Sequence, residues 1–158
     1  MLAMTLALSA KVHAGLDQPE NLQGLCAVFD GLDINTVTDS NEQLKLGLIS
    51  GLRSLQCRDS MRAKLLLERS AMQDNAEAQF HLCKWYSDNE DAVSVIAWCK
   101  LSSENGSADG KRAYEFYKNS TFEAAYIEGL KKAERLRSQI DSNSNKSLKA
   151  GTPQSGAP

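Results

Sequence analysis

The chain has 158 residues, with 18 Lys and Arg against 20 Asp and Glu, and a formal net charge of −2. This near-neutral balance argues against a nucleic-acid binder, which normally carries a basic surplus. Hydrophobic residues make up 42% and charged residues 24%, a globular rather than a disordered composition. No proline interrupts a helix between Glu20 and Thr152. The composition therefore favours one helical domain. It argues against nucleic-acid binding and leaves the other classes of function open.

The first residues are an uncharged apolar run of the length found in signal peptides, Met1-Leu-Ala-Met-Thr-Leu-Ala-Leu-Ser-Ala10. Val12 and Ala14 would occupy positions −3 and −1 of a cleavage site after Ala14. The competing interpretation is a buried N-terminal helix. The run is too short to span a bilayer. We expect residues 1–14 to be a signal peptide and the mature chain to be exported, with no stable membrane insertion.

Residues 15–40 are expected to form an N-terminal capping helix and a loop, with apolar positions at Leu22, Leu25, Cys26 and Phe29. Helical patterning continues over residues 59–72, for which Asp59 or Ser60 is a suitable N-cap. A further helix is predicted over residues 76–87 and is capped by Asn75. Its apolar stripe is expected to face inward and consists of Ala78, Leu82, Cys83 and Tyr86.

A repeat lies in the middle of the chain, because residues 95–109 align with residues 63–77 at an offset of 32. The matched pairs include Leu66/Trp98, Ser70/Ser102, Asn75/Ser107 and Ala76/Ala108. Each unit is predicted to be a pair of helices, and one pair alone cannot bury its apolar face. Stacked pairs are therefore expected.

The end of the chain is predicted to be a closing helix followed by a tail. Ser120 and Glu123 form a capping-box pattern at the start of that helix, and Leu130 and Leu136 are among its apolar positions. Residues 141–158 are mostly small and polar, so we expect them to be a disordered tail.

The repeat carries a resemblance to a known family. Residues 62–86 read Arg62-Ala63-x-x-Leu66-Leu67-x-Arg69-Ser70-Ala71-x-x-Asp74-Asn75-Ala76-x-Ala78-Gln79-Phe80-x-Leu82-Cys83-x-x-Tyr86. This pattern resembles the Sel-one-like repeat, a relative of the tetratricopeptide repeats. Asp74 and Cys83 stand where the family has glycine.

The resemblance implies an all-α fold: a short right-handed solenoid of antiparallel helix pairs over residues 41–140, with helical caps. It also implies a non-enzymatic protein–protein interaction scaffold or adaptor in the bacterial envelope, periplasmic or secreted after signal cleavage. The partner would be an unidentified protein bound on the concave face. An alternative is a peptidoglycan- or glycan-binding or glycan-hydrolysing envelope protein, and another is a thiol-disulfide module.

Four cysteines in an exported chain predict disulfide bonds. We prefer the pairing Cys26–Cys57 with Cys83–Cys99, because the last two lie on adjacent predicted helices. The alternative is that Cys83 and Cys99 are buried small apolar residues. No C-x-x-C pattern signals a zinc ribbon or a thioredoxin-type site.

Little in the sequence indicates catalysis. His81 is the one histidine that the mature chain would keep, and it cannot share a metal with Cys83 because positions i and i+2 point to different sides of a helix. The acidic turn of Asp88, Glu90 and Asp91 could hold a cation weakly, but Asp91 is more simply a helix N-cap. We therefore expect no catalytic residue, no metal site and no cofactor.

The candidate site is the outer side of the first helix of each pair, since that helix lines the concave face of such solenoids. Trp85 is the candidate anchor, and its packing against a neighbouring repeat is the alternative. The sequence leaves the oligomeric state open. The predicted partner-binding residues are Lys45, Ile49, Glu77, His81, Lys84 and Trp85.

Overall fold

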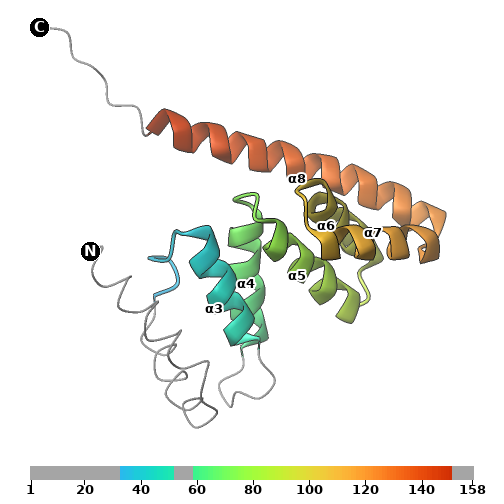
Figure 1. The fold of residues 1–158 in the computed structure, drawn as a ribbon, viewed down its shortest axis with the longest axis horizontal. Helices are drawn as coiled ribbons and strands as arrows, with labels where there is room; N and C mark the ends of the chain where they lie inside the picture. Colours follow the sequence, from blue (N-terminus) through green and yellow to red (C-terminus); the bar gives the residue numbers. More distant parts are fainter. Residues whose placement is uncertain (1–32, 52–58, 151–158) are drawn as a thin grey trace, which may run out of the picture. The chain divides into compact units, whose positions relative to one another are not determined.

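The structure is a computed structural model that describes residues 33–51 and 59–150 (Figure 1). These residues form helices and no strand, which confirms the predicted all-α class for this part of the chain. The helices are α3 (Ser40–Ser50), α4 (Ser60–Ala71), α5 (Ala76–Asp88), α6 (Ala92–Glu104), α7 (Ala108–Ser120) and α8 (Glu123–Ala150). The predicted signal peptide, most of the predicted N-terminal cap, and both Cys26 and Cys57 lie outside the described residues. Within the described ranges, no helix has the length and apolar character needed to cross a bilayer.

The chain divides between Leu66 and Leu67 into two compact units, and each is described by itself. In the first unit, Asp39 caps α3 by accepting a hydrogen bond from the Glu42 amide at 2.9 Å. The Gln43 side chain is buried and donates to the Val37 carbonyl at 2.7 Å. These local bonds fix the start of α3.

Helix N-caps recur every sixteen residues from the start of α4, at Asp59, Asn75, Asp91 and Ser107. Each side chain accepts a hydrogen bond from the backbone amide three residues later, at distances of 2.8, 3.0, 2.9 and 3.0 Å in that order. A side-chain oxygen at this position satisfies an amide that has no partner within the helix. The predicted caps Asp59, Asn75 and Asp91 are therefore confirmed.

Three tight turns join the helices from α4 to α7 in the same way. Each contains one residue in the left-handed region, namely Asp74 (φ 64°), Glu90 (φ 58°) and Gly106 (φ 89°). The amide of the following N-cap residue then donates back to the carbonyl five positions earlier, as from Ser107 to Ser102 at 3.0 Å. This is the Schellman geometry of helix C-termini. The offset of 32 superimposes Asp74 on Gly106, so the sequence repeat is also a repeat of backbone conformation.

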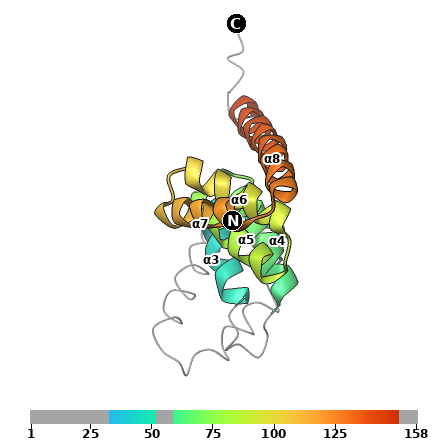
Figure 2. The same cartoon turned by 90° about the vertical axis from the view of Figure 1, so that its right-hand side faces the viewer.

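Helix α6 is the centre of the second unit. It packs against α5, α7 and α8, so it is covered on several sides (Figures 1 and 2). A helix in this position must be apolar or small all round. Its buried residues are Ser94, Val95, Ile96, Ala97, Trp98, Cys99, Leu101 and Ser102.

Two expectations for the C-terminal part are wrong. Ser120 is the last residue of α7, and its hydroxyl donates to the Phe116 carbonyl at 2.9 Å, so it does not form a capping box with Glu123. Helix α8 also continues to Ala150 instead of ending near Ile140, although the side chains of residues 141–146 are all exposed. An existing helix is extended at low cost, whereas a new one must first be nucleated. The rest of the predicted tail, residues 151–158, lies outside the described residues.

Candidate functional site: the outer side of α5

Three of the predicted partner-binding residues form a polar row on α5. Glu77 and Lys84 are exposed, and His81 between them has 24% of its side chain exposed. His81 Nε2 lies 3.3 Å from Glu77 Oε1, the i,i+4 contact of neighbouring helical turns. The ammonium of Lys84 lies 5.7 Å from the centroid of the Phe80 ring, within the range of a cation–π contact. The row therefore presents both charge signs beside an aromatic ring.

Burial lowers the pKa of His81 below its usual value, and the positive charge of Lys84 acts in the same direction. The carboxylates of Glu77 and Asp109 oppose this shift without cancelling it. His81 is therefore neutral at neutral pH. It can accept as well as donate a hydrogen bond there.

Trp85 is half-buried and meets Tyr86 edge to face, with 5.0 Å between the ring centroids. Tyr86 is held in turn, because its hydroxyl donates to Glu68 Oε1 at 3.1 Å and the ammonium of Lys132 lies 5.4 Å from its ring centroid. The side chain of Trp85 is thus supported by packing and still partly open to solvent. The sequence left two interpretations of Trp85, an exposed binding residue or a packed one. Each describes part of its surface, because one part contacts Tyr86 and another is open to solvent.

The two predicted residues on α3 belong to the first unit. Lys45 is exposed, as expected for a surface residue. Ile49 is only 4% exposed, so its assignment to the binding surface is wrong and it is a core residue. An aliphatic side chain of this size is stabilised by about 1.5–3 kcal/mol when it is fully buried.

Helix α7 adds residues that the sequence analysis did not single out. The Ser87 and Tyr117 hydroxyls hydrogen-bond at 2.6 Å and join α5 to α7. The offset of 32 places Asp109 at the position of Glu77, and Phe116 at that of Lys84. The repeat alignment already reaches Asp109, and extending it beyond residue 109 would have identified Phe116 as well. The outer sides of α5 and α7 together make the candidate site.

The Sγ atoms of Cys83 and Cys99 lie within disulfide-bonding distance, and their Cα atoms are 5.2 Å apart. This confirms the predicted pairing of α5 with α6. Both cysteines are fully buried, and disulfide exchange needs access for an attacking thiolate. The bridge therefore fits a structural role: it fixes the helix that carries the polar row to the central helix.

A polar network ties α8 to two of the tight turns. Arg137 lies 2.8 Å from Asp74 Oδ1 and donates to Asn105 Oδ1 at 2.9 Å, and Asn105 in turn donates to the buried Gln79 at 2.8 Å. Asp74 and Asn105 belong to the corresponding turns of successive helix pairs. Arg137 therefore bridges one pair to the next.

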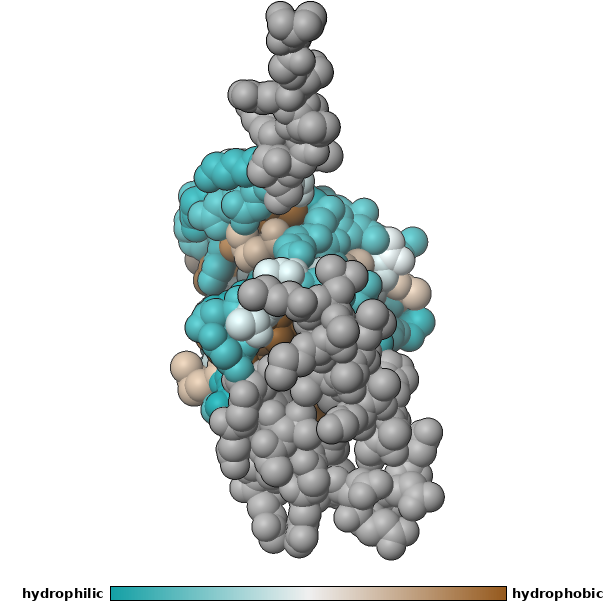
Figure 3. Space-filling view, turned by 90° about the vertical axis from the view of Figure 1, so that its left-hand side faces the viewer, coloured by the Kyte–Doolittle hydropathy of each residue, from teal (hydrophilic) through white to brown (hydrophobic). Residues whose placement is uncertain are grey.

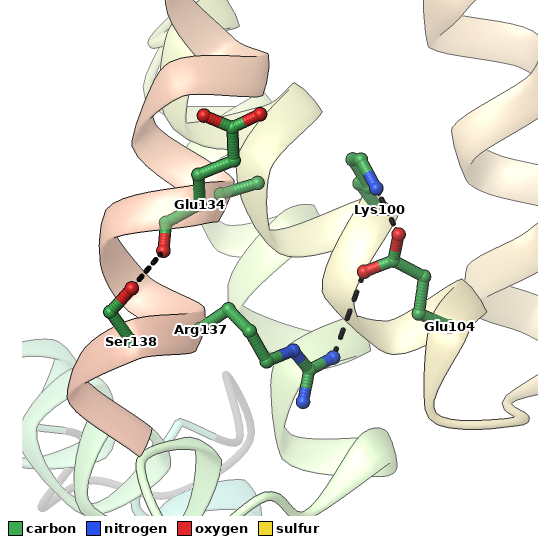
Figure 4. A pocket seen from close by; sticks show the side chains of 6 residues that line it. Lys100, Glu104, Glu134, Arg137 and Ser138 are labelled. Carbon is green, nitrogen blue, oxygen red and sulfur yellow. Dashed lines mark hydrogen bonds and ion pairs between the residues drawn. The ribbon is translucent and has the colours of Figure 1, made fainter. Parts of the chain in front are cut away.

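A pocket of about 350 Å³ lies beside this network, between α6 and α8 (Figure 4). Arg137 points from α8 toward Glu104 of α6, 3.7 Å away, and Lys100 also pairs with Glu104 (Figure 4). The basic groups of the pocket are thus engaged by acidic groups of the chain itself. This arrangement fits a structural polar seam between two helices better than an anion site.

A serine beside a lysine also occurs in the second unit. The Ser94 hydroxyl accepts from the Lys132 ammonium and contacts the Asp91 carboxylate. Burial acts to raise the pKa of Asp91, but the hydrogen bonds from Ser94 and the charge of Lys132 outweigh it and lower that pKa. Ser94 has no exposed surface, so a substrate cannot reach its hydroxyl. The group stabilises the start of α6.

The remaining described surface offers no stronger site. Asp91 of the acidic turn caps α6, and within the described ranges no three potential metal-ligating side chains of His, Cys, Asp or Glu cluster together. On the face drawn in Figure 3 the described side chains are mainly hydrophilic, with small hydrophobic areas between them. The chain matches no protein-family model, no curated protein sequence and no solved structure. A functional conclusion therefore depends on the geometry of this chain.

Proposed function

We propose that the chain is a non-enzymatic protein-binding scaffold or adaptor, built as a short right-handed solenoid of antiparallel helix pairs. The observation that carries this proposal is the repeated packing in the second unit. Consecutive helices α5 and α6 pack together, as do α6 and α7, and α5 also contacts α7 while α6 contacts α8. Contacts between every second helix are those expected of stacked pairs. The corresponding left-handed turns at Asp74 and Gly106 support the same arrangement.

The outer sides of α5 and α7 are the proposed binding surface. Stacking brings corresponding helices of successive pairs, here α5 and α7, side by side and leaves one side of each open to a partner. That side carries Glu77, Lys84 and Phe116, which supply both charge signs and an exposed ring. Half-buried Trp85 adds a supported aromatic edge, and aromatic residues dominate binding energy in protein interfaces.

The proposed location is the bacterial periplasm or the exterior. The Cys83–Cys99 bridge supports it, since stable disulfides belong to oxidising compartments. The apolar run of residues 1–14 supports it as a signal-peptide pattern. Inside a reducing compartment the bridge would have no comparable role.

A crosslinking pull-down of the full chain from native envelope extract tests the function. The variant Lys84→Glu reverses a charge on the proposed surface, and Lys146→Glu makes the same change on the exposed part of α8. We expect one stoichiometric protein partner with the unmodified chain and with Lys146→Glu, and loss of that partner with Lys84→Glu. Circular dichroism of each variant checks that the helices are intact.

Two outcomes would contradict the proposal. Equal recovery of the partner by both variants would remove the outer side of α5 from the interface. Recovery of cell-wall fragments without a protein partner would replace the scaffold with the glycan-binding alternative.

A further inference from the structure

Asn105 and Gly106 form the one Asn-Gly pair among the 158 residues of the chain. In such a pair the amide nitrogen of the glycine can attack the side-chain carbonyl carbon of the asparagine, because glycine has no side chain to obstruct the approach. Ammonia leaves and a five-membered succinimide ring forms, which water opens to aspartate or isoaspartate. The pair lies in the turn between α6 and α7, so the conformation of that turn decides whether the reaction can begin.

The backbone of this turn holds the reacting atoms apart. Asn105 has a ψ of 11°, which places the Gly106 nitrogen nearly eclipsed with the backbone nitrogen of Asn105. Ring closure requires the Gly106 nitrogen to be eclipsed with Cβ of Asn105 instead, about 120° away around the tetrahedral Cα. The Gly106 amide is also engaged, since it donates to the Ser103 carbonyl at 3.2 Å. The attack is therefore blocked while the turn keeps this conformation.

The side chain of Asn105 is fixed as well. Its Nδ2 donates to Gln79 Oε1 at 2.8 Å and to Asp74 Oδ1, and its Oδ1 accepts from Arg137 at 2.9 Å. We call Asp74, Gln79, Asn105 and Arg137 the turn network. Arg137 comes from α8, whereas Asp74 lies in the turn between α4 and α5, and Gln79 lies on α5. Asn105 can therefore rotate into the reactive conformation only after hydrogen bonds to both neighbouring elements break.

Neither product can restore the turn network. Aspartate lacks the two Nδ2 hydrogens, so Oε1 of the buried Gln79 loses the hydrogen bond from Asn105. The new carboxylate would also face the carboxylate of Asp74, and like charges repel. Isoaspartate adds a methylene to the main chain, inside a turn that is closed by the hydrogen bond from the Ser107 amide to the Ser102 carbonyl at 3.0 Å. Either product therefore weakens the attachment of α8 to the two turns.

We propose that Asn105 is a site of spontaneous deamidation, controlled by the opening of the turn between α6 and α7. The asparagine is preserved while the turn network is intact. Opening of the turn allows the ring to form, and hydrolysis makes the change permanent: a carboxylate replaces the amide, one water is consumed and one ammonia is released. The chain thus carries a one-way switch that loosens α8. This inference does not rest on the proposed binding function.

The rate of conversion depends on how often the turn opens. When opening and closing are fast compared with ring formation, the rate in the folded chain equals the rate in the unfolded chain multiplied by the open fraction. We expect Asn105 to react at least about tenfold more slowly in the folded chain than in the chain unfolded by guanidinium chloride. Arg137→Ala removes a partly screened ion pair and a hydrogen bond from the turn network, so it should speed the reaction in the folded chain by about fivefold.

Peptide mapping by mass spectrometry measures the conversion, since replacing an amide by a carboxyl group changes the mass of the peptide that contains Asn105. The full chain is incubated at mildly alkaline pH, folded and unfolded, and the folded variants are incubated beside it. Arg135→Ala is the matched control for Arg137→Ala, because it removes an exposed arginine from the same helix. We expect the control to convert at the rate of the unmodified chain. Circular dichroism checks that each variant keeps its helices.

The variant Asn105→Asp reproduces one product directly and tests its consequence. We expect its midpoint of thermal unfolding to fall by roughly 2–8 °C, because a buried acceptor loses its donor and two carboxylates are brought together. Asn143→Asp makes the same change on the exposed part of α8 and should leave the midpoint unchanged.

Three outcomes would overturn the proposal. Equal rates in the folded and unfolded chains would show that the turn does not protect Asn105. Equal rates for Arg137→Ala and Arg135→Ala would show that the turn network does not control the opening. An unchanged midpoint for Asn105→Asp would show that the product is tolerated, so that deamidation switches nothing.

Discussion

The close approach of α8 to α6 at Gly129 gives a quantitative prediction. A Cβ added at Gly129 would lie 2.6 Å from Ile96 Cβ, 2.7 Å from Ile96 Cγ2 and 3.0 Å from the Val93 carbonyl oxygen. None of these atoms is the free end of a flexible side chain. Gly129→Ala must therefore shift one helix away from the other.

Two effects of opposite sign decide the size of the change. Alanine in a helix interior is favoured over glycine by about 1 kcal/mol. Overpacking a close contact costs typically about 1–3 kcal/mol, and a clash with fixed atoms belongs to the upper part of that range. We expect net destabilisation of about 1–2 kcal/mol, which lowers the midpoint of thermal unfolding by roughly 2–4 °C per kcal/mol.

The assay is thermal and urea unfolding followed by circular dichroism, with Gly51→Ala as the control. A Cβ at Gly51 would meet its nearest neighbour, Ala63 Cβ, at 3.5 Å, which is ordinary contact. The control should therefore change the free energy of unfolding little. An equal or higher midpoint for Gly129→Ala would refute the helix spacing and the reasoning built on it.

Three further predictions concern other contacts. Cys83→Ala/Cys99→Ala should lower the free energy of unfolding by about 3 kcal/mol in urea, since the bridge closes a loop of sixteen residues; equal stability of the variant and the oxidised protein would contradict it. Arg137→Ala should lower the free energy of unfolding by about 1 kcal/mol in the same assay, because Asp74 is 44% exposed and its ion pair with Arg137 is partly screened by solvent. An unchanged free energy of unfolding would mean that this ion pair contributes nothing to stability. Burial lowers the pKa of His81 in the folded state, so below pH 6.5 the unfolded chain binds the proton more readily and the free energy of unfolding falls as the pH drops. His81→Gln should reduce this loss of stability between about pH 7.5 and pH 5. An unchanged pH profile of stability in the variant would contradict the prediction.

The sequence by itself determined the local features of this fold. The caps Asp59, Asn75 and Asp91 were predictable because a cap depends on one side-chain oxygen and an amide three residues away. The Cys83–Cys99 bridge was predictable because a short turn forces consecutive helices to lie side by side. In both cases the interacting groups are close in sequence.

Only the tertiary structure decided which surfaces are covered. Ile49 resembles a surface position in the pattern of α3 but is buried, and Ser120 resembles an N-cap but ends α7. Arg137 reaches Asp74 across 63 residues, a contact that no short-range pattern encodes. A capping hydrogen bond joins groups within one helical turn. The burial of a side chain depends instead on which helix, distant in sequence, packs against it, and the tertiary packing as a whole decides this.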